Sequence, residues 1–197
     1  KVSRGMHLTA TWLTAIGAAL SALWILVANA WMQFPTGMQF NPDSVRNEMV
    51  DFFAVIFSPV AINKFLHSVS AGWVLGAIFV ISISSWYLLK KREDFLARNS
   101  MKVAAWIGLA GILLVLYTGD GSAYWAGKKQ PMKLAAMEGV YEGSEGRGLI
   151  AVGVLNPEKK TYDDDVEPFL FKIEIPKLLS ILATRHVDGF VPGIENI

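Results

Sequence analysis

Residues 65–89 read FLHSVSAGWVLGAIFVISISSWYLL, a run of 25 residues without a formal charge. Two similar runs flank it, with 38 uncharged residues between Arg4 and Asp43 and 17 between Lys102 and Asp120. A helix needs about 20 apolar residues to cross the hydrocarbon core of a bilayer, which is about 30 Å thick. A surface helix of a soluble protein keeps a charged face, and these runs have none. The sequence therefore predicts three membrane-spanning helices, at about residues 7–33, 58–89 and 101–124.

The composition of the whole chain supports this interpretation and excludes other classes. The 197 residues are 53% hydrophobic and 18% charged, with no Cys. A disordered chain, a disulfide scaffold and a thiolate metal site are thereby excluded. Because 18 Lys and Arg are balanced by 17 Asp and Glu, the chain has no strongly basic surface, and we expect no nucleic-acid partner.

Residues 128–197 have a different, hydrophilic composition, with 9 Lys and Arg against 11 Asp and Glu, including an acidic run at 163–165. Within them, Lys133–Glu142 has helical spacing, Phe169–Ile175 alternates like a strand, and Leu178–Ala183 resembles a short apolar helix. We therefore predict an all-α, polytopic transmembrane helix bundle over residues 1–127. A hydrophilic loop follows over residues 128–197.

The basic residues predict an orientation in the membrane. The connection 35–58 holds Arg46 against three acidic residues, whereas the amino end and the connection after the second helix are basic. The positive-inside rule places that basic connection in the cytoplasm and residues 128–197 outside. The chain opens with Lys and shows no signal peptide, so we interpret it as a middle piece of a larger membrane protein. The amino end and the connection after the second helix together hold seven basic residues: Lys1, Arg4, Lys90, Lys91, Arg92, Arg98 and Lys102.

His67 is the most informative ionisable residue in the predicted helices, since such groups at membrane depth usually mark a function. The small residues Ser68, Ser70, Ala71 and Gly72 follow it and leave flat space beside the imidazole. A planar macrocycle needs such a face, and haem iron is commonly held by His. The pattern alone leaves open whether His67 binds haem iron or a neighbouring helix. His7 and His186 are more typical of interfacial and solvated residues.

Lys133 and Glu138 form a second candidate site. On a helix they diverge by about 140°, so they can approach one ring from different sides. A quinol head group needs a donor such as Lys133 and a carboxylate such as Glu138 that accepts a hydroxyl proton. On the residues alone, an ordinary solvated amphipathic helix is the favoured explanation of the same two residues.

Several longer stretches resemble one known family. Their combined order and length resemble subunit I of the cytochrome bd-type quinol oxidases, and the similarity covers nearly the whole chain. The resemblance makes this chain the family's fourth to sixth membrane helices plus the front of its external quinol-binding loop, the Q-loop. The stretches are TWLTAIG at 11–17, LSALWILVANAWMQ at 20–33, SPVAINKFLH at 58–67, GD at 119–120, KLAAME at 133–138 and ILATRHVD at 181–188.

The resemblance implies roles for individual residues. His67 matches the axial iron ligand of the low-spin haem b, which accepts electrons from quinol. Lys133 and Glu138 match the loop pair associated with quinol binding and oxidation, and Asp120 matches an acidic residue at the base of that loop that takes part in proton transfer. Arg185 lies in a matching loop motif and is assigned a structural role.

The resemblance also implies what the rest of the protein supplies. The sixth ligand of the His67 haem, the high-spin haem b and haem d would be held by other helices of the subunit. Ubiquinol or menaquinol would be the substrate, and subunit II, small accessory subunits and membrane lipid the partners. The implied location is a bacterial or archaeal plasma membrane, and this piece alone would not reduce oxygen.

Two other classes remain open on the residues alone. Lys64, His67 and Asp120 would line a polar path if the helices belonged to a transporter or channel. The small-residue faces would instead suit a structural anchor for a partner subunit.

Overall fold

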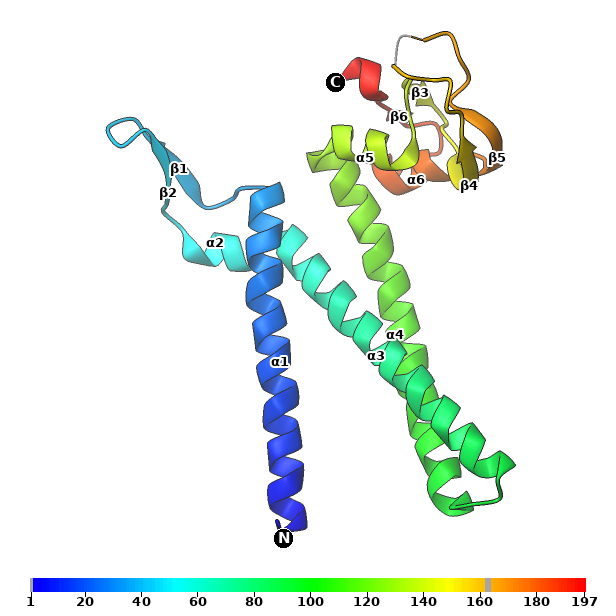
Figure 1. The fold of residues 1–197 in the computed structure, drawn as a ribbon. Coiled ribbons are helices and arrows are strands. Elements are labelled where there is room, and N and C mark those ends of the chain that lie inside the picture. The colour runs from blue at the N-terminus through cyan, green and yellow to red at the C-terminus, as the bar shows by residue number, and fades with distance from the viewer. Residues whose placement is uncertain (1, 162–163) are drawn as a thin grey trace. The chain divides into compact units, whose positions relative to one another are not determined.

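The computed structural model describes residues 2–161 and 164–197, so Lys1 of the basic amino end and Asp163 of the acidic run lie outside the described residues. The chain divides into two compact units, residues 1–119 and 120–197. This division falls inside a long helix, ahead of the predicted boundary at 127/128, which stays a prediction. Figure 1 labels the α-helices and the strands of both units.

Three long helices dominate the first unit: α1 (Arg4–Gln33), α3 (Pro59–Leu89) and α4 (Asp94–Lys129), the last of which continues into the second unit. All three are long and apolar enough to cross a membrane. The prediction of a mostly helical chain with three candidate spanning helices is thus confirmed. α4 begins earlier and ends later than predicted: it has 36 residues and is about 54 Å long. The prediction covered only its apolar middle, whereas the helix also includes charged residues at both ends.

The starts of these helices follow local capping chemistry. The Ser3 and Ser58 side chains accept hydrogen bonds from the backbone N–H groups of Met6 and Ala61, and so cap α1 and α3. Pro59 occupies the first turn of α3, where its missing N–H costs nothing. The connection between α1 and α3 forms a hairpin, β1 (Met38–Asn41) with β2 (Arg46–Met49), and a short helix, α2 (Phe52–Ile56). Neither element was predicted from the sequence.

The helices contact one another through small residues and leave apolar side chains outside. A Cβ at Gly108 would lie 3.0 Å from the Cβ of Ala77, and one at Gly111 would lie 2.9 Å from Val74, so α3 and α4 approach closely there. Outward-facing side chains such as Leu75 and Trp106 are 72% and 73% exposed. Such an apolar exterior is expected where helices face lipid or further helices.

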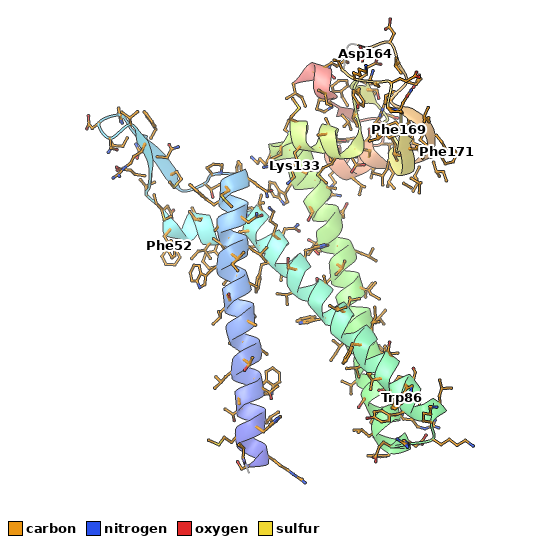
Figure 2. The ribbon with its side chains drawn as sticks, in the orientation of Figure 1. Phe52, Trp86, Lys133, Asp164, Phe169 and Phe171 are labelled. Atoms are coloured by element: carbon orange, nitrogen blue, oxygen red, sulfur yellow. The ribbon has the colours of Figure 1, made fainter. Side chains whose placement is uncertain are left out.

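The second unit packs short elements around a small apolar core. The core consists of Leu134, Ala135, Val140, Leu179, Ala183 and Val191. After α4 come α5 (Pro131–Glu138), β3 (Ser144–Glu145), β4 (Leu149–Leu155), β5 (Phe169–Ile175), α6 (Leu178–Thr184), β6 (Phe190–Val191) and a 3-10 turn, η1 (Ile194–Asn196). β4 pairs with β5 and β3 with β6, each antiparallel. Figure 2 shows Lys133 on α5 and the labelled Phe169 and Phe171 on β5.

The predicted strand at Phe169–Ile175 is confirmed as β5, and the predicted helix at 178–183 as α6. The helix predicted at Lys133–Glu142 is confirmed over residues 133–138, but its bounds differ: α5 starts at Pro131 and ends at Glu138. It stops there because Gly139 adopts a left-handed conformation with φ of 61°. A Cβ at Gly139 would also lie 2.6 Å from the ring of Phe169.

Candidate functional site

His67 lies on α3 and is held by a residue of α4. Its Nδ1 lies 3.0 Å from Oγ1 of Thr118, and Thr118 is 1% exposed. The side-chain amide of Asn63, one turn earlier, donates to the backbone carbonyl of Thr118 over 3.0 Å. Two polar contacts therefore join α3 to α4 at the level of the histidine.

The hydrogen bonds of Thr118 determine the tautomer of His67. The Thr118 hydroxyl donates to the carbonyl of Leu114 over 2.6 Å, so its proton is already used. Oγ1 can then only accept, which makes Nδ1 of His67 the protonated nitrogen. No described residue donates a hydrogen bond to Nε2. An imidazole that is held through Nδ1 and has Nε2 open is the arrangement of a metal-ligating histidine.

Few bulky side chains surround His67. The ring is half-buried, and a Cβ at Gly119 would meet its Cε1 at an ordinary 3.6 Å. Ser68, Ala71 and Gly72 are exposed, as expected for a flat face, whereas Ser70 is buried. Ser70 donates to the carbonyl of Leu66 over 2.7 Å. A single open imidazole nitrogen beside such small residues fits a histidine that would hold haem iron.

Lys64 points to a different helix from His67. Its Nζ donates to Oδ1 of Asn29 on α1 over 2.7 Å, and the amide of Gln33 donates to the same oxygen over 3.1 Å. This network joins α1 to α3 through groups that are half-buried. The lysine thus contacts α1, a partner that its spacing from His67 did not indicate.

In the second unit, Asp120 is paired with Arg185. Nη1 of Arg185 lies 2.5 Å from Oδ1 of Asp120. The guanidinium also lies over the ring of Tyr124, 4.9 Å from its centroid. Asp120 and Tyr124 are one turn apart on α4, so the arginine contacts one face of that helix.

Lys133 and Glu138 both lie on α5, but in different environments. Lys133 is exposed, whereas Glu138, the last residue of the helix, is half-buried. Burial raises the pKa of the Glu138 carboxyl above its ordinary value. A raised pKa suits a carboxylate that has to bind and release protons near neutral pH.

Three of the residues that organise these sites were not predicted from the sequence. Thr118, Asn29 and Tyr124 are neutral, and nothing in their spacing shows which side chain each contacts across helices. Arg185 was predicted to have a structural role. Its contact with Asp120 could not be predicted from the sequence, because the two residues are 65 positions apart. His7 and His186 are exposed. Among the described residues, no group of three or more His, Asp and Glu side chains is placed to hold a metal ion.

Comparison with known proteins gives consistent results. The family model for cytochrome bd terminal oxidase subunit I matches residues 1–197. The chain is 45% identical over its whole length to the cytochrome bd-II ubiquinol oxidase subunit 1 of Escherichia coli, covering 37% of that protein. It is 33% identical to the cytochrome bd ubiquinol oxidase subunit 1 of Bacillus subtilis, covering all of this chain and 40% of that one.

A solved structure supports the fold. The bd oxidase from Geobacillus thermodenitrificans matches the whole chain with a TM-score of 0.78 and 27% identity, and the match covers 43% of that structure's chain. The chain thus spans about two fifths of the length of the relatives it matches. On the match of its full length, the chain belongs to the cytochrome bd terminal oxidase subunit I family.

Proposed function

We propose that this chain is the quinol-oxidising and haem-binding part of a membrane-bound quinol:oxygen oxidoreductase. The observation that carries the proposal is the geometry of His67, in a chain that belongs to the cytochrome bd family. Nδ1 is fixed by Thr118, and Nε2 is left to bind iron. Bound there, a low-spin haem b would accept single electrons and pass them on.

The second unit would bind the quinol. Lys133 donates a hydrogen bond to one oxygen of the head group, and Glu138 accepts a hydroxyl proton as the two electrons leave. Because burial raises the pKa of Glu138, its carboxylate holds that proton more tightly than an exposed glutamate would. Asp120 receives the second proton or passes it to solvent. Residues 128–197 would lie on the extracytoplasmic side, so both protons are released there.

The remaining chemistry would belong to the rest of the protein. The second axial ligand of the His67 haem, the high-spin haem b and haem d would come from other helices of the subunit. Subunit II and small accessory subunits would complete the complex, in a bacterial or archaeal plasma membrane. Relatives named ubiquinol and menaquinol oxidases both match this chain, which supports a quinol of either kind as substrate.

A difference spectrum of the full-length protein tests the proposal. We expect the dithionite-reduced minus oxidised spectrum to show low-spin haem b, and His67→Ala to remove that signal. His186→Ala, which alters an exposed histidine, is the matched control and should keep it. A parent protein without haem bands would refute the oxidase function, and an unchanged spectrum in His67→Ala would refute the ligand assignment alone.

A further inference from the structure

We propose that Arg185 is a positioning residue for quinol oxidation, which fixes the carboxylate of Asp120 so that one oxygen is held and the other is presented to the substrate. The inference rests on the proposed function. It assigns to Arg185 a part in the reaction, in place of the purely structural role expected from the sequence.

The contacts of Asp120 are asymmetric. Nη1 of Arg185 binds Oδ1, and no described residue donates a hydrogen bond to Oδ2. The guanidinium is simultaneously placed over Tyr124, one turn along α4. A planar guanidinium that both stacks and pairs has little freedom to rotate. The carboxylate is therefore held in one orientation, with Oδ2 left to accept a quinol hydroxyl.

The backbone at Arg185 is unusual. Arg185 ends α6 in a left-handed conformation with φ of 67°, a position that favours Gly or Asn. A left-handed residue just after the last turn is a common way for a helix to end, so Arg185 is part of the turn that terminates α6.

Close packing of α6 against α4 fixes the position of the Arg185 backbone. A Cβ at Gly127 on α4 would lie 3.0 Å from the Cβ and 3.1 Å from the carbonyl oxygen of Ala183 on α6. The two helices therefore meet at backbone distance, two residues before Arg185. This contact fixes where the arginine side chain starts and lets it reach Asp120.

Folding stability is a poor explanation for the pair. The side chains of Arg185 and Asp120 are 42% and 38% exposed, and ion pairs in that range contribute little to stability. The same helix carries a comparable pair at its other end, Lys177 with Asp188, at 2.7 Å and with both side chains more exposed. Lys177 also adopts a left-handed conformation, with φ of 63°. It therefore provides a matched control.

The test is a double-mutant cycle in the full-length oxidase in membranes, with a short-chain ubiquinol as the probe. The variants are Arg185→Gln, Arg185→Lys, Asp120→Asn, the double variant Asp120→Asn with Arg185→Gln, and the control Lys177→Gln. For each, kcat and KM are measured together with the low-spin haem spectrum, which reports whether the protein is folded.

We expect Arg185→Gln to lower kcat/KM about tenfold or more, because misplaced groups lose orientation, while the haem spectrum is unchanged. Arg185→Lys should recover part of the loss. The double variant should be no worse than Asp120→Asn alone, and Lys177→Gln should stay within about twofold of the parent.

Three results would overturn the inference: full activity in Arg185→Gln, effects of the two single variants that multiply in the double variant, or an equal loss in Lys177→Gln. These outcomes differ from a failure of the proposed function. If Asp120→Asn and Arg185→Gln are both silent while Lys133 and Glu138 variants lose turnover, the positioning role is wrong and the quinol site stands. A parent that does not oxidise quinol refutes the proposed function itself.

Discussion

Thr118 on α4 accepts a hydrogen bond from Nδ1 of His67 on α3 over 3.0 Å, and its own hydroxyl donates a hydrogen bond to the carbonyl of Leu114. One threonine thus determines the tautomer of a histidine on another helix. Because α3 and α4 pack through Gly108 and Gly111, the orientation of the imidazole depends on the packing of the two helices. The proposed iron ligand is consequently part of the helix interface.

Thr118→Val should weaken haem binding at His67. Valine keeps the shape of threonine but removes the acceptor for Nδ1–H, so the ring loses the contact that fixes its tautomer. Loss of such a supporting partner typically costs about 10- to 100-fold in metal affinity. The ratio of low-spin haem b to protein, measured in the full-length oxidase, should fall.

Thr118→Ser is the control for this substitution, since serine keeps the hydroxyl that accepts from Nδ1–H. It should retain haem at close to the parental ratio. Equal haem content in the valine and serine variants would contradict the role given to the hydroxyl.

Asn29→Leu should destabilise the contact between α1 and α3. The substitution removes the oxygen that accepts from both Lys64 and Gln33. Loss of a half-buried acceptor for a charged donor costs about 1–3 kcal/mol. Thermal unfolding of the full-length protein, followed by haem absorbance, should shift to lower temperature.

Asn29→Asp tests the same contact by strengthening it. It keeps an acceptor oxygen and adds a negative charge beside the Lys64 ammonium, so the unfolding temperature should be retained or raised. A leucine variant as stable as the parent would show that the Lys64–Asn29 contact contributes nothing.

The sequence predicted the elements with a strong local pattern and missed those that depend on contacts. The three long helices follow from uncharged runs, and β5 from the alternation over Phe169–Ile175. The β1–β2 hairpin has no such alternation, and its strands are only four residues long. α5 ended early because the left-handed Gly139 packs against Phe169, a residue 30 positions later.

The candidate site shows the same division. His67 was identified because an imidazole is rare in an apolar helix, and the small residues after it suggested an open face. Thr118 was not, since a threonine near the end of an apolar run is ordinary. The pairing of Asp120 with Arg185 depends on how α6 packs against α4, which local pattern does not encode.

Lys133→Gln should weaken quinol binding. The substitution removes the cation proposed to donate to the head-group oxygen, so KM for quinol should rise about tenfold, the size of one lost charged hydrogen bond. The low-spin haem spectrum should be unchanged, because Lys133 lies on α5 and His67 on α3.

Lys172→Gln is the control for charge. Lys172 pairs with Glu174 on β5 and is not part of the proposed quinol site, so the variant carries the same loss of charge in the same unit. If it raised KM as much as Lys133→Gln does, the effect would be one of overall charge and not of a specific contact.

Glu138 should impose a pH dependence on turnover. Burial raises its pKa, so the carboxylate that we propose as the acceptor of the quinol proton becomes protonated at a higher pH than an exposed glutamate would. As the pH falls through the raised pKa, kcat should fall with it, and this acidic limb should lie above the range of an ordinary glutamate. Glu138→Gln should lower kcat and abolish the limb.

The same shift predicts a pH dependence of stability. A carboxyl whose pKa is raised by folding binds its proton more tightly in the folded state, so its contribution to stability is greatest in acid. That contribution is lost as the pH rises from the ordinary glutamate value through the raised one. Limited proteolysis of the second unit should therefore quicken over this window in the parent but not in Glu138→Gln. Glu142→Gln, which alters an exposed neighbour, should keep both pH dependences of the parent; if it abolished them as well, they would not arise from Glu138.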